Sequence, residues 1–96
     1  MMEQAPPSRS KFTIEVSDGA DKKMIEFAKM AILLAFEEFP NDDLEKCNLI
    51  SSKFMEQYGH KWGVSLIKNG DCLFHYHKSY LKIKYKDYNI KIMRTS

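Results

Sequence analysis

The stretch that most constrains the fold of this 96-residue chain lies between residues 62 and 93, where four short strand-like segments follow one another. The segments cover residues 62–67, 72–77, 80–85 and 89–93, and apolar and polar residues tend to alternate within them. Alternation with a period of two is typical of strands that bury one face. The stretch therefore predicts a small antiparallel sheet, and it contains no grouping of residues typical of a catalytic centre.

A strand and a helix are predicted before this sheet. Residues 11–16 alternate apolar and polar, and Asp21 stands where it can cap a helix that runs to about Phe39. One apolar stripe of this helix comprises Ile25, Ala28, Ile32, Ala35, Phe36 and Phe39. Further apolar residues widen the stripe, so we expect this helix to be covered on more than one side.

A second helix is predicted after Pro40, because proline disfavours the helical conformation of the residue before it. Asp42 and Glu45 have the spacing of a capping box, and Gly59 is a suitable terminator. The predicted apolar stripe consists of Leu44, Cys47, Ile50, Phe54 and Tyr58. The order of elements indicates an α+β fold in which two helices pack on an antiparallel β-sheet.

The turns and the N-terminus complete the predicted organisation. Asn69-Gly70 favours a tight hairpin, since both positions accept positive φ, and residues 86–88 form another turn. Residues 1–10 contain Pro6-Pro7 and small polar residues, which are typical of a flexible tail or linker. Residues 11–96 are expected to form one domain, because a chain of this length has room for one core.

Charge and composition limit the classes of function. Residues 1–61 hold 8 Lys/Arg and 11 Asp/Glu, whereas residues 62–96 hold 7 and 2, so the strand half is basic. A basic sheet is compatible with nucleic acid, but lysines on strands also protect sheet edges from aggregation, and we expect no nucleic-acid partner. Two cysteines, no signal peptide and no long apolar run predict a cytoplasmic protein without membrane insertion.

The chain offers little reactive chemistry, and no enzyme activity or cofactor is expected. His75 and His77 lie two residues apart, a spacing that would chelate a metal only with a third ligand such as Cys72 or His60. No second pair of ligands has a recognised spacing, so no metal site is predicted. Cys47 lies on a predicted apolar stripe and is expected to be a small core residue.

The chain resembles the small dynein light chain family, the dimeric hub type associated with dynein and myosin motors. The resemblance is carried by Met24, by Phe54, Tyr58 and Trp62 at four-residue spacing, and by Lys68-Asn69-Gly70 at the following turn. It covers about residues 11–96. It implies a non-catalytic module that forms a strand-swapped homodimer and binds extended target segments, with dynein intermediate chain as one possible partner and a cytoplasmic, cytoskeleton-associated location.

The resemblance also implies which residues form the site. The strand Cys72–His77 would cross to the partner's sheet, and a target would lie beside it as an added strand. The residues implied to line the peptide groove are Asn69, Gly70, Asp71, Cys72, Leu73, Phe74 and His75, with Leu81, Ile83 and Tyr85 as its floor. The residues implied to form the dimer interface are Trp62, Gly63, Val64, Ser65, Leu66, Cys72, Phe74 and Tyr76.

Several positions depart from the family pattern. The lysine that usually meets a glutamine of the target is replaced by Asp43 or Leu44, and Gly63 stands where an interfacial histidine lets acid split the dimer. A different target motif and an acid-stable dimer are therefore expected. One branch of the family joins such a domain to EF-hands in flatworm tegumental calcium-binding proteins. The alternative prediction is thus a structural dimerisation domain of a larger protein, with a groove that is not used.

Overall fold

The computed structural model describes residues 12–69 and 80–95, which form two helices and four strands. The sheet has the order β1-β3-β4-β2, and all its neighbouring strands are antiparallel. The elements are β1 (Phe12–Asp18), α1 (Lys22–Glu38), α2 (Asp43–Tyr58), β2 (Trp62–Lys68), β3 (Tyr80–Tyr85) and β4 (Tyr88–Arg94).

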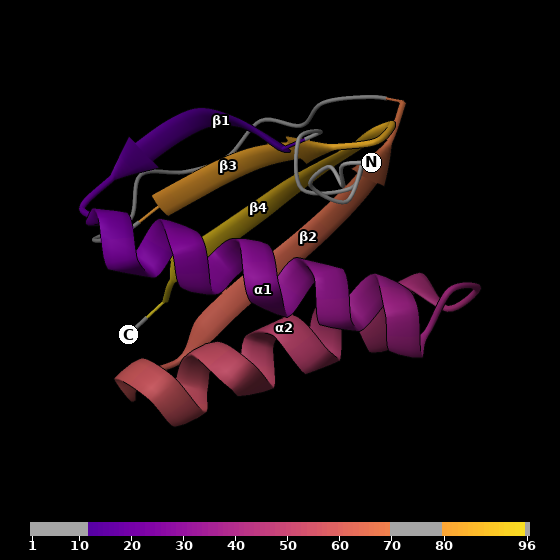
Figure 1. The fold of residues 1–96 in the computed structure, drawn as a ribbon. Helices are drawn as coiled ribbons and strands as arrows, with labels where there is room; N and C mark the ends of the chain where they lie inside the picture. Colours follow the sequence, from indigo (N-terminus) through magenta and orange to yellow (C-terminus); the bar gives the residue numbers. More distant parts are fainter. Residues whose placement is uncertain (1–11, 70–79, 96) are drawn as a thin grey trace, which may run out of the picture.

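Both helices lie over the same face of the sheet, with α2 beside β2 and α1 running obliquely across the sheet (Figure 1). This arrangement confirms the predicted α+β class, and the strand predicted at residues 80–85 has the same bounds in the structure. The predicted strand at residues 72–77, and with it the strand swap, lies outside the described residues. None of the helices that the structure describes is long and apolar enough to cross a membrane.

The predicted helix ends are confirmed, with one difference. Asp21 and Asp42 cap the two helices, their carboxylates accepting hydrogen bonds from the backbone N–H of Met24 at 2.9 Å and of Glu45 at 3.1 Å. In the predicted capping box Glu45 would accept from the Asp42 N–H, but that N–H donates to the Phe39 carbonyl at 3.3 Å. The tight corner between the helices thus brings the Phe39 carbonyl to the Asp42 N–H, in place of the Glu45 side chain. Gly59 ends α2 with φ of 71°.

The core lies between the helices and the sheet. Alanines on α1 let that helix approach the strands closely, while Phe54 and Trp62 fill the space under α2 with rings 5.0 Å apart. The indole N–H of Trp62 donates to the Gly59 carbonyl at 2.7 Å, so the aromatic series also fixes the turn between α2 and β2. Buried residues from both helices and from β3 and β4 are Ala28, Ala31, Ile32, Ala35, Ile50, Leu81, Ile83, Tyr85, Ile90 and Ile92.

One predicted core position is wrong. Leu44 was expected on the apolar stripe of α2, but 69% of its surface is exposed, whereas Lys46 is only 1% exposed. At 100° per residue, Leu44 lies about 120° around the helix from Ile50, which points into the core. Lys46 replaces it because polar and aromatic groups at the corner between the helices surround its ammonium group, as described below.

Candidate functional site: a strand edge and a helix flank

The outer edge of β2 is the first part of the candidate site. β2 pairs with β4 along all seven of its residues without a register shift. The Thr95 N–H donates to the Lys61 carbonyl, and the Asn69 N–H donates to the Asp87 carbonyl. The backbone N–H and C=O groups of the odd-numbered residues of β2 therefore point toward β4. The backbone N–H and C=O groups of Trp62, Val64 and Leu66 therefore point to the other side. Among the described residues, no strand pairs with that side.

One side of α2 overhangs this edge, and it is the second part of the site. We call it the α2 flank and define it by Leu44, Cys47, Asn48, Ser51 and Met55, which share one side of the helix. The Ser51 hydroxyl donates to the Trp62 carbonyl at 2.8 Å, which places the flank directly beside the β2 edge. Leu44 and Met55, 69% and 45% exposed, present apolar side chains to solvent at its two ends.

Cys47 is the titratable residue of the α2 flank. Burial raises the pKa of its thiol, and the backbone N–H of Leu66 opposes that shift through a hydrogen bond. The interaction is a second contact between the flank and the outer edge of β2. Because burial dominates, the thiol stays protonated at neutral pH and is a poor nucleophile. The predicted core role of Cys47 is confirmed in part, since the residue is half-buried rather than fully enclosed.

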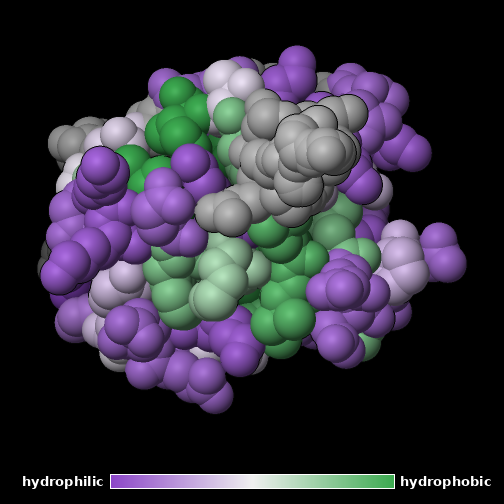
Figure 2. All heavy atoms as spheres, viewed as in Figure 1, coloured by the Kyte–Doolittle hydropathy of each residue, from purple (hydrophilic) through white to green (hydrophobic). Residues whose placement is uncertain are grey.

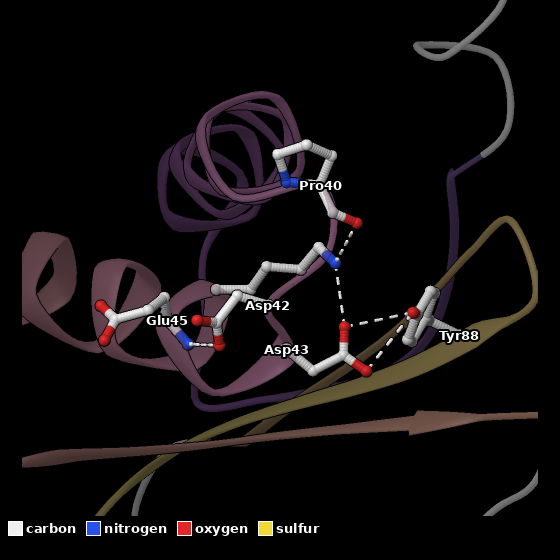
Figure 3. A network of polar contacts seen from close by, with 6 residues as sticks. Pro40, Asp42, Asp43, Glu45 and Tyr88 are labelled. Atoms are coloured by element: carbon white, nitrogen blue, oxygen red, sulfur yellow. Dashed lines mark hydrogen bonds and ion pairs between the residues drawn. The ribbon is translucent and has the colours of Figure 1, made fainter.

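A polar network holds the first turn of α2 in place (Figure 3). The Lys46 ammonium donates to the Asp43 carboxylate at 2.9 Å and to the Pro40 carbonyl at 3.2 Å. It also lies 4.7 Å from the centre of the Phe36 ring and 5.5 Å from that of Tyr88, within reach of cation–π attraction. The Tyr88 hydroxyl donates to the same carboxylate at 3.2 Å. Both helices and β4 are thereby joined at the point where Leu44 projects outward.

The network also sets the charge beside Leu44. The hydrogen bond from Lys46 lowers the pKa of the Asp43 carboxyl, and the Tyr88 hydroxyl and the charge of Lys68 act in the same direction. Asp43 is therefore ionised at any pH at which the protein is expected to work. With the capping Asp42 and with Glu45 it makes the start of α2 acidic.

The predicted floor of the peptide groove is in the core of the single chain. Leu81, Ile83 and Tyr85 lie on β3 under the helices and are at most 2% exposed. In this structure they pack against α1 rather than line an open surface. Phe12 stacks on Tyr85 with ring centres 4.5 Å apart, and Phe36 meets the same ring edge-on.

The structure divides the predicted dimer-interface residues of β2 between the two faces of the sheet. Trp62, Val64 and Leu66 point toward the helices and pack on the core. Gly63 and Ser65 point to the opposite face, because side chains alternate along a strand. A Cβ atom at Gly63 would lie 3.3 Å from the Thr95 methyl group and 3.6 Å from Met93 Cγ, so little room exists there for a larger side chain.

The remaining predicted site residues lie at or beyond the limit of the described chain. Asn69 is exposed at the end of β2 with φ of 53°, a value that asparagine tolerates. The other positions fall outside the described residues, and their roles remain predictions: Gly70, Asp71, Cys72, Leu73, Phe74, His75, Tyr76 and His77. Within the described ranges, no group of three or more His, Cys, Asp or Glu side chains is placed to hold a metal ion.

The α2 flank was not among the predicted site residues. The periodicity of apolar residues assigned Leu44 and Cys47 to the buried stripe of the helix and did not indicate Ser51 or Met55. The periodicity of uncharged residues would have indicated this side, since residues 44, 48, 51 and 55 are uncharged and recur at spacings of three or four. That spacing defines a second uncharged side of α2 next to its buried side.

A hollow beside α1 is a second feature of the surface. A cavity of about 480 Å³ is lined by Phe12, Glu26, Lys29, Met30 and Leu33, between the start of β1 and the helix. Hydrophobic side chains gather in the middle of the helical face and are bordered by hydrophilic ones (Figure 2). This agrees with the expectation that the apolar face of α1 is wider than the sheet can cover.

The strand order, with two helices over one face of the sheet, is a dynein light chain-like fold. Two solved structures that the chain resembles both show the dynein light chain-like domain of the Fasciola hepatica calcium-binding protein FhCaBP2. The native form has a TM-score of 0.78 and 12% identity, covering 97% of this chain and 100% of that one. The mercury derivative has a TM-score of 0.75 and 14% identity, covering 96% and 99%.

The likeness confirms, at the level of the fold, the resemblance inferred from the sequence. At this identity it extends to the fold alone. The chain matches no protein-family model, and no curated protein is significantly similar to it in sequence.

Proposed function

We propose that this protein is a non-catalytic module that forms a homodimer and binds extended segments of other proteins. The observation that carries the proposal is the outer edge of β2, which is regular over seven residues and unpaired in the described part of the chain. Natural proteins usually protect such an edge with a bulge, a proline or an inward-pointing charge. β2 has neither a register shift nor a proline.

The proposed dimer pairs each β2 edge with a strand of the second copy. Val64 offers one N–H and one C=O to that strand, and Leu66 offers a C=O, so the new strand gains a ladder of backbone hydrogen bonds. The dynein light chain-like fold supports this arrangement. The residues proposed to supply the crossing strand are 72–77, and a target segment would add next to them, under the α2 flank.

The edge is tested by removing one outward N–H. Val64→Pro deletes a donor that faces away from β4, and proline is tolerated on the open side of an edge strand. Light scattering should give about twice 11.3 kDa for the original chain and about 11.3 kDa for the variant. Ser65→Pro is the matched control, because it removes a donor to β4 and should instead lower the free energy of unfolding.

A monomeric original chain, or a Val64→Pro variant that stays dimeric, would contradict the proposal. Light scattering at about pH 5 tests whether acid splits the dimer. We expect the dimer to stay intact, because Gly63 stands at the position of the family's interfacial histidine and cannot titrate. Membership of a dynein motor complex, binding of dynein intermediate chain and a cytoplasmic, cytoskeleton-associated location remain predictions that rest on the family resemblance.

A second candidate is a structural dimerisation domain within a larger calcium-binding protein. It is favoured by the likeness to a domain of FhCaBP2 and by the exposed Leu44 at the start of α2. A dimer that binds no extended segment would favour this second function over the first.

A further inference from the structure

The α2 flank has a chemical character that limits what it can bind. No charged side chain occurs among its five residues, while Leu44 and Met55 expose apolar surface at its ends. The network around Lys46 fixes the first turn of the helix, so the position of the Leu44 backbone is set before any partner arrives. Ser51 is already engaged with the β2 edge, so the exposed part of the flank consists of the two apolar ends with Asn48 between them.

The distance between these ends gives the spacing of the partner's side chains. Leu44 and Met55 are eleven positions apart on a helix that rises about 1.5 Å per residue, or about 16 Å. In an extended chain, residues four apart point to the same face and are separated by about 13 Å. Residues six apart also share a face and are separated by about 20 Å, so the reach of the two flexible side chains spans the difference for a spacing of four or of six. Residues two apart would be separated by about 7 Å and could not contact both ends.

Charge near Leu44 gives the second requirement. Asp42, Asp43 and Glu45 flank it in the sequence, and because the Lys46 ammonium pairs with Asp43, the net negative charge at this end of the flank comes from Asp42 and Glu45. A cationic side chain next to the apolar one would be attracted, whereas an acidic one would be repelled.

We propose that the α2 flank selects extended segments of partner proteins that carry two apolar side chains four or six residues apart, with a basic residue near the one that meets Leu44. This inference rests on the proposed function and names the class of target.

The test uses the 96-residue protein and three fluorescein-labelled heptapeptides, with binding measured by fluorescence anisotropy. The first probe is Arg-Leu-Thr-Thr-Thr-Leu-Arg, whose symmetry makes the direction of binding unimportant. In the second probe both leucines are replaced by glutamine, and in the third both arginines are replaced by glutamate. The first probe should bind about a hundredfold more tightly than the second, about tenfold for each leucine that is desolvated, and about tenfold more tightly than the third, in which the charge near Leu44 is reversed.

Two variants link the selectivity to the flank. Leu44→Lys should weaken binding of the first probe about tenfold. Met30→Lys is the matched control, since Met30 is an exposed methionine on α1 near the other hollow, and it should leave the affinity unchanged. Light scattering of each sample shows whether it is a dimer, and this separates a failure of the proposed function from a failure of the proposed target class.

A monomeric original chain would overturn the proposed function itself. A dimer would overturn only the target class if it bound the glutamine probe as tightly, if its affinity did not respond to Leu44→Lys, or if it bound no probe at about 1 mM.

Discussion

The buried ammonium of Lys46 allows a quantitative test of what holds the corner between the helices together. Removing the charge while keeping the length of the side chain, in Lys46→Met, separates the packing of the stem from the polar contacts. Lys46→Ala removes both. The comparison matters because the side chain is almost completely buried, while its partner Asp43 keeps about half of its side-chain surface in solvent (52%).

The expected magnitudes follow from the contacts. Lys46→Met loses the hydrogen bond to the Pro40 carbonyl, about 1 kcal/mol, an ion pair with a half-exposed carboxylate, at most about 1 kcal/mol, and about 1 kcal/mol of cation–π attraction. It also removes the cost of burying an ammonium group, which is several kcal/mol. The free energy of unfolding should therefore change by about 1 kcal/mol or less. Lys46→Ala deletes three buried methylenes at about 0.8 kcal/mol each, for a loss of about 3 kcal/mol with the cavity.

Urea denaturation at pH 7 and at about pH 3 measures how much the buried stem of Lys46 and how much its ion pair with Asp43 contribute to the free energy of unfolding. The lowered pKa of Asp43 means that its contribution to stability is present above the unfolded pKa, near 4, and is lost as the pH falls through the folded value. The original chain should lose this contribution on acidification, and most of it should be missing from Lys46→Met at either pH. If Lys46→Met is as unstable as Lys46→Ala at pH 7, the ion pair rather than the stem dominates, and the reasoning is refuted.

Three smaller effects are expected at other positions. Ser51→Ala should lower the free energy of unfolding by about 1 kcal/mol because the Trp62 carbonyl loses its donor, and Ser52→Ala, on the exposed side of α2, should have no effect in the same urea titration. Lys86→Asn should raise the free energy of unfolding by about 0.5 kcal/mol, since Lys86 has φ of 57° and asparagine tolerates that conformation; a decrease would contradict this. Cys47 should react with iodoacetamide at pH 8 at least about tenfold more slowly in the folded protein than in urea, as mass spectrometry of the modified site can show.

Local chemistry was sufficient to predict most of the elements. Asp21, Asp42 and Gly59 mark helix ends through side-chain and backbone properties that act within a few residues, and the alternation in residues 80–85 reports a strand buried on one face. The two-helix, antiparallel-sheet class followed from the order of these signals. Trp62 was implied only as a dimer-interface residue, and the structure places it in the core of the single chain, 6% exposed.

The site depended on contacts between residues distant in the sequence. Leu44 and Lys46 are two residues apart, and the periodic pattern assigned the leucine to the interior. The structure reverses that assignment because Phe36 of α1, Pro40 of the turn between the helices and Tyr88 of β4 come together around the ammonium group.

The sequence alone thus determined the helix ends, the strands and the class of fold, since those depend on short-range propensity and periodicity. Only the tertiary structure decided which side of α2 faces the open edge of β2, because that choice depends on how the buried sides of helix and sheet fit together. The Ser51 hydroxyl at 2.8 Å from the Trp62 carbonyl shows the result of that fit. No pattern within α2 could have shown that its uncharged side would lie beside a strand edge with which no strand pairs in the described part of the chain.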